Sequence, residues 1–111
     1  MKLELNDLSE ILTKIHDYPW DHALYLVGTY PWRKDTPCAV LNPDEIEDFP
    51  EKQIIAEKYR LNYVLSVQQA QDLTKNTHEQ IKNVTSEQLI DAFNFYYKND
   101  AFIEDVRKEK L

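Results

Sequence analysis

Glycine is almost absent from this 111-residue sequence, which contains only Gly28. Loops that cradle phosphate groups need several residues that tolerate positive φ or a close backbone approach, so nucleotide-binding loops of that kind are excluded. Cysteine is equally scarce, and the single residue Cys38 can form no disulfide within the chain. Because Cys38 lies in an apolar run, we interpret it as a small core residue and not as a nucleophile.

Long apolar runs are also missing, and no stretch approaches the length of a membrane span. The first residues include Glu4 and Asp7, where a signal peptide would need an apolar segment. We therefore expect a cytoplasmic protein without a membrane partner.

Negative charge is what the sequence has in excess, with 20 acidic residues against 13 basic ones and a net charge of −7. Residues 1–51 hold the whole excess, whereas residues 52–111 carry as many bases as acids. A negative protein repels phosphate backbones, so direct nucleic-acid binding is disfavoured and a basic protein partner is favoured. The alternative is that the charge only maintains solubility.

The hydrophobic pattern predicts one α+β domain spanning residues 1–111. Three short apolar runs indicate buried strands at 23–27, 38–41 and 62–67. Helical spacing indicates four helices, at about 6–16, 50–60, 67 to about 78, and 86–98. We expect a small sheet of about three strands packed against about four helices, with the first and last helices covering it. Residues 101–103 are expected to dock on the core, and residues 104–111 to form a frayed tail.

Local signals fix some of these boundaries. Thr85 is followed three residues later by Gln88, the pattern of a reciprocal capping box at a helix start. Ser66 is placed to cap the start of the third helix, and Pro50 suits the first position of the second helix. All five prolines fall between residues 19 and 50, so most of residues 17–50 is expected to be turn and loop.

Groups for catalysis or metal binding form no recognisable motif. The three histidines, His16, His22 and His78, lack the spacing of a metal-binding pair. Three serines are candidates for a nucleophile, but each lies at or near a predicted helix start and none lies in a nucleophile-elbow motif. They are Ser9, Ser66 and Ser86. We therefore assign no catalytic residue, no metal ligand and no cofactor.

The sharpest local feature is an acidic run between residues 44 and 51, which contains no base. We predict an acidic recognition loop whose carboxylates meet Lys or Arg of a partner, with Phe49 or Trp32 as apolar anchor. The alternative is a solvated surface without a partner. The carboxylates of the predicted loop are Asp44, Glu45, Glu47, Asp48 and Glu51.

Three segments together resemble a known group of proteins: residues 36–44 with the acids that follow, residues 61–67, and residues 92–102 with the stretch Phe-Asn-Phe-Tyr-Tyr. They are similar to small acidic bacterial proteins of the immunity type, encoded beside contact-dependent inhibition systems and other polymorphic toxins. The resemblance covers about residues 23–103. It implies a cytoplasmic single-domain protein that neutralises a toxin by binding it, and it implies no catalytic residue.

Three hypotheses follow. In the first, the protein is an immunity protein that binds a cognate basic toxin domain of the nuclease type and blocks its active site or its access to substrate. In the second, it is a small regulatory or adaptor domain, with a homodimer as one form, that binds a protein unrelated to any toxin. The third, an enzyme acting on a small substrate, requires a pocket with a perturbed titratable group.

Overall fold

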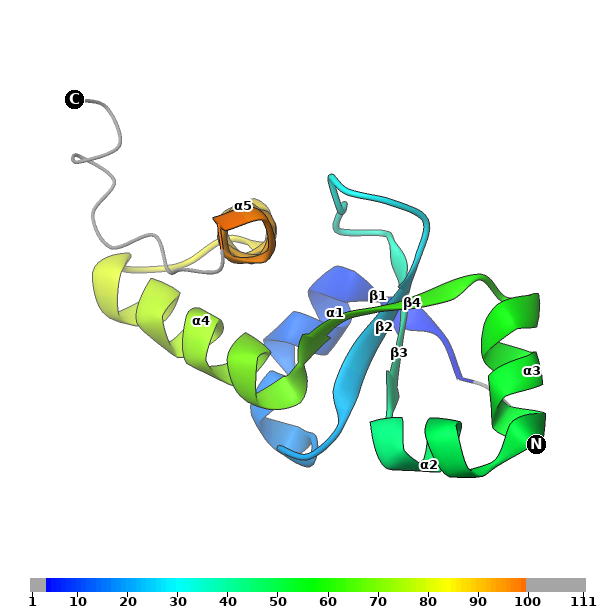
Figure 1. Ribbon diagram of the computed structural model, residues 1–111. Helices are drawn as coiled ribbons and strands as arrows, with labels where there is room; N and C mark the ends of the chain where they lie inside the picture. The colour runs from blue at the N-terminus through cyan, green and yellow to red at the C-terminus, as the bar shows by residue number, and fades with distance from the viewer. Residues whose placement is uncertain (1–3, 100–111) are drawn as a thin grey trace.

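Residues 4–99 are described by a computed structural model, and they form one antiparallel sheet with helices on both faces (Figure 1). This confirms the predicted α+β class. The expectations for residues 101–103 and 104–111 lie outside the described residues. In spatial order, the sheet consists of β1 (Asn6–Asp7), β3 (Pro37–Leu41), β2 (Ala23–Val27) and β4 (Leu61–Ser66).

The strands match the three predicted runs to within one residue at each end, and β1 is an addition. With only two residues, β1 is too short to show an alternating pattern. The helices of the described residues are α1 (Leu8–Thr13), the short 3-10 helix η1 (Ile15–Asp17), α2 (Pro43–Asp48), α3 (Pro50–Lys58), α4 (Val67–Gln80) and α5 (Ser86–Asn99).

The predicted capping signals are confirmed. The Ser66 hydroxyl accepts from the backbone N–H of Gln69, whose side chain accepts in return from the Ser66 N–H. Thr85 and Gln88 make the same reciprocal pair before α5, at 2.9 and 3.2 Å. Helix α4 continues to Gln80, beyond the predicted end near residues 76–78.

One face of the sheet carries the main hydrophobic core. Leu24 and Leu26 of β2 are fully buried there beside Cys38 of β3. Helices α1 and α4 pack against strands of the sheet, while α5 packs chiefly on α1 and α4 and brings Phe93 into the same core. The last helix therefore covers the sheet mainly through the other two helices, and not directly as expected.

The opposite face of the sheet presents the alternate residues, among them Tyr25 of β2 with its neighbours Ala39 and Tyr63. Strands β3 and β4 both pair with β2, on its two sides, so the connection between them has to cross β2. That connection contains α2 and α3, which lie on the side of the sheet away from α1, α4 and α5 (Figure 1).

A polar clasp holds the β2–β3 connection to α5. The side-chain amide of Asn94 accepts from the Trp32 backbone N–H and donates to the Trp32 carbonyl, both at 2.8 Å. The two hydrogen bonds satisfy the backbone N–H and carbonyl of Trp32, as a neighbouring strand would. They hold Trp32 at a position where its ring is buried.

Replacement of Asn94 by Ala should therefore cost about 1–3 kcal/mol of unfolding free energy, because two partly buried backbone groups lose their partner at once. Urea unfolding followed by circular dichroism measures this loss. The matched control is Asn76→Ala on α4, whose side-chain oxygen accepts a hydrogen bond from exposed Gln80. Equal stability of the two variants would show that the clasp contributes nothing.

Candidate protein-interaction surface

The α2–α3 corner, residues 43–58, is where the predicted recognition segment lies. Phe49 is at once the C-cap of α2 and the N-cap of α3, with extended backbone at φ −119° and ψ 105°. Pro43 and Pro50 each stand in the first turn of a helix, where a missing N–H costs no hydrogen bond. Two short helices thus meet at an angle, with Phe49 at the vertex.

The prediction that the acidic segment is a loop was wrong, because most of it is helix α2. The Asn42 side chain caps this helix by accepting from the backbone N–H of Asp44 at 3.0 Å. Asp44 and Glu45 occupy the first turn, where carboxylates are favoured by the helix dipole. The carboxylates are therefore held on a fixed scaffold, which lowers the entropy cost of ordering them on a partner.

All five predicted acidic residues are exposed, and the structure brings them together on this corner. Only Glu45 has a cationic partner there, in an ion pair with Lys52 of α3. Within residues 4–99, the other carboxylates of the corner form no ion pair. Among the five predicted acids, those without an ion pair are Asp44, Glu47, Asp48 and Glu51, and exposed Glu57 at the far end of α3 also has none.

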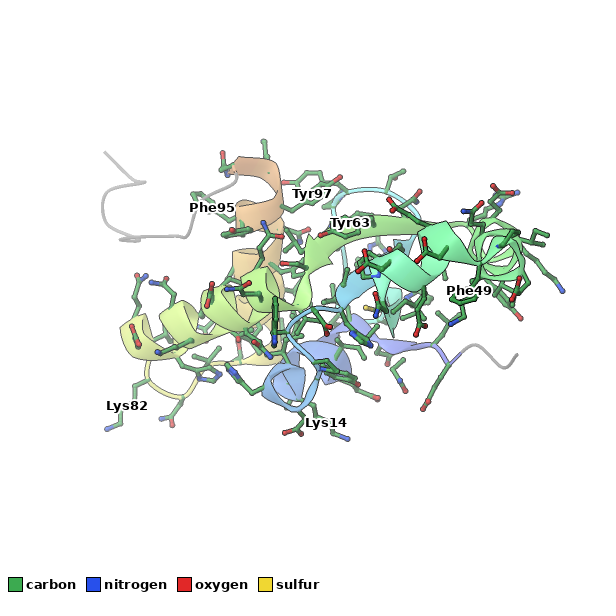
Figure 2. The ribbon with its side chains drawn as sticks, turned by 60° about the horizontal axis from the view of Figure 1, so that its bottom comes forward. Lys14, Phe49, Tyr63, Lys82, Phe95 and Tyr97 are labelled. Atoms are coloured by element: carbon green, nitrogen blue, oxygen red, sulfur yellow. The ribbon has the colours of Figure 1, made fainter. Side chains whose placement is uncertain are left out.

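Apolar side chains accompany the acids. Phe49 is 46% exposed and Ile54 is 65% exposed. Figure 2 shows Phe49 at the end of the molecule away from Phe95 and Tyr97 of α5. The Lys52 ammonium lies 5.3 Å from the centre of the Phe49 ring, within reach of a cation–π interaction that orients the ring.

Ile54 is the apolar residue of this surface that the sequence pattern did not single out. It stands beside Ile55 in the second predicted helix, and both residues are apolar. Neighbouring residues on a helix point about 100° apart, and such a pair can be buried together, as Ile11 and Leu12 of α1 are. The local sequence therefore contains no signal that Ile54 is exposed while Ile55 is half-buried.

The face of the sheet on the side of α2 and α3 carries a pair of aromatic side chains. Burial, then the neighbouring Tyr63 and the Glu47 carboxylate, raise the pKa of Tyr25. The Tyr25 and Tyr63 rings meet edge to face with centroids 5.6 Å apart. Tyr63 is 53% exposed, so one ring of this aromatic pair is open to solvent.

Trp32 does not belong to this surface. Its side chain is 4% exposed and packs in the main core beside α5. The indole Nε1 makes no hydrogen bond to any residue of the described part of the chain. Burial of the ring therefore leaves Phe49, and not Trp32, as the available anchor.

A small apolar pocket of about 50 Å³ lies between α2, α3 and the sheet. Its apolar walls come from both helices and from two strands that β2 separates. Glu45 and Lys52, which form the ion pair, also line it. The residues of the apolar walls are Leu41, Ile46, Ile55, Ala56 and Leu61.

The groups considered for catalysis lie apart from this corner. His22 Nδ1 is 3.0 Å from the Asp21 carboxylate on the neighbouring residue, and His16 and His78 are exposed. Within residues 4–99, no three His, Cys, Asp or Glu side chains are grouped so as to hold a metal ion. Burial raises the pKa of the Cys38 thiol to about 12, which keeps it protonated at neutral pH.

Cys38 should therefore be inert towards a thiol reagent such as Ellman's reagent while the protein is folded, and react fully in concentrated urea. Since the chain has one cysteine, the absorbance reports this thiol alone. Rapid labelling under native conditions would contradict the buried assignment.

The raised pKa also predicts lower stability as the pH rises from 9 toward 12, because in this range the thiol ionises only in the unfolded chain.

No helix in the described range is long and apolar enough to cross a membrane. The fold and the corner define a small α+β domain with an acidic, partly apolar surface. Residues 5–105 match the family model described as a domain of unknown function, DUF7716, and the chain belongs to that family. No curated protein and no solved structure matches the chain.

Proposed function

We propose that this protein is an immunity protein that binds a cognate basic toxin domain of the nuclease type in the cytoplasm. It uses the α2–α3 corner to block the active site of the toxin or its access to substrate. The observation that carries the proposal is the set of four exposed carboxylates without a cationic partner, placed beside exposed Phe49 and Ile54.

The physical basis is complementarity of charge. A nuclease attracts phosphates with a positive cleft, and a fixed cluster of carboxylates competes for the same cations. Unpaired surface charge accelerates encounter with such a cleft, while an aromatic residue buried on binding slows dissociation. The corner holds both kinds of group within residues 44–54.

Reversal of two charges in the last turn of α2, Glu47→Lys with Asp48→Lys, should slow association with the partner about tenfold at low salt. Lysine is favoured at this end of a helix, so the fold should persist. The matched control reverses Asp72 and Glu79, exposed residues of α4, and changes the net charge equally. Binding kinetics are compared by surface plasmon resonance on partner captured from the native host.

An equal reduction in both double variants would mean that net charge alone acts and that the corner is not the contact surface. An association rate unchanged by reversal at the corner would refute the assignment of the acids.

Neutralisation is tested in growing cells. The captured partner, expressed alone in a bacterial test strain, should arrest growth, and co-expression of this protein should restore it. The Glu47→Lys, Asp48→Lys variant should protect less well than the control variant. A partner that does not arrest growth, or recovery of only a second copy of this chain, would favour the adaptor or homodimer function instead.

A further inference from the structure

We propose that the small pocket beneath the α2–α3 corner receives one aliphatic side chain of the partner, from a segment in which Lys or Arg flank that residue. The inference rests on the proposed function, because it assigns the chemistry of the partner at the same surface. It adds an anchoring site, distinct from Phe49, that the sequence did not predict.

The lining of the pocket selects an apolar occupant. Five aliphatic side chains form most of its wall, so a bound water would find few hydrogen-bond partners there. Four of them, Leu41, Ile46, Ile55 and Leu61, are half-buried, and solvent reaches them as it would not reach a sealed core cavity. An aliphatic group entering from a partner would complete their burial.

The size of the pocket limits the occupant. Its volume of about 50 Å³ is well below the roughly 150 Å³ of a cavity that holds benzene. The branched end of Val, Ile or Leu is the group that matches this space, whereas an aromatic ring is too large. The wall is built from both helices and from β3 and β4, so the pocket exists only when α2 and α3 are folded against the sheet.

Charge around the pocket selects the neighbours of that side chain. The two charged residues of the wall, Glu45 and Lys52, neutralise each other in their ion pair. The remaining charge on α2 is negative and unmatched, at Asp44, Glu47 and Asp48. A segment with Lys or Arg on either side of its aliphatic residue therefore meets carboxylates, whereas an acidic segment is repelled.

Synthetic peptides test the inference without the toxin. We expect Lys-Lys-Leu-Lys-Lys to shift the methyl NMR signals of Ile46, Ile55 and Leu61, with a Kd at least about tenfold below that of Lys-Lys-Gly-Lys-Lys. The acidic peptide Glu-Glu-Leu-Glu-Glu should leave these signals unchanged. Equal affinity for the Leu and Gly peptides, or no shift with either, would overturn the proposal.

Two substitutions in the wall provide matched variants of unchanged charge. Ala56→Leu should fill the pocket and abolish the preference for Leu over Gly, while weak binding to the lysines persists. Ile55→Ala should enlarge the pocket and shift the preference toward Lys-Lys-Phe-Lys-Lys. Amide NMR spectra report whether each variant is folded, and a folded Ala56→Leu variant that retains the Leu preference would place the binding elsewhere.

The pocket and the proposed function fail in different ways. If the Leu peptide binds as expected but no toxin is captured from the host, the pocket is confirmed and the immunity function is wrong. If a toxin is captured and neutralised but the peptides show no Leu preference, the pocket is refuted and the immunity function stands.

Discussion

Pairing of β2 with a strand on each side is the constraint on which the rest of this structure depends. β3 and β4 both lie antiparallel to β2, and the chain between them therefore has to pass over β2. Helices α1, α4 and α5 gather on one face of the sheet, which leaves the other face to that connection. The position of the α2–α3 corner follows from the order of the strands.

The two faces of the sheet therefore differ in role: one carries the main core, and the other carries the proposed contact surface. The core face buries Leu24, Leu26 and Phe93 completely beneath α1, α4 and α5. The crossing connection is covered on one side only, so it can expose Phe49, Ile54 and a row of carboxylates. A surface of this kind tolerates variation in its side chains because the main core does not depend on them.

The sequence predicted most of the fold because strong local signals agree with tertiary packing. Apolar runs located β2, β3 and β4, and a capping serine and a capping box located the starts of α4 and α5. The sequence does not predict α2, because this six-residue helix begins at Pro43 and ends two residues before Pro50, and closely spaced prolines are typical of loops. The signal was present in Asn42-Pro43-Asp44, a capping side chain followed by proline at the first helical position.

The candidate surface was only partly predictable for a related reason. The acids could be found from sequence because they lie within eight positions of one another. Trp32 was misplaced because its position is fixed by Asn94, far along the chain. The pocket joins Leu41, Ile55 and Leu61 from separate elements, so no local pattern contains it. Contacts between distant segments, and not local propensity, decide both features.

The central claim is that the α2–α3 corner is the contact surface. Hydrogen–deuterium exchange of the protein alone and in complex with its captured partner tests it most directly. The account predicts slower exchange of backbone amides at 43–58 on binding, with exchange along α4 unchanged. Protection confined to α4 and α5, with residues 43–58 exchanging as in the free protein, would contradict it.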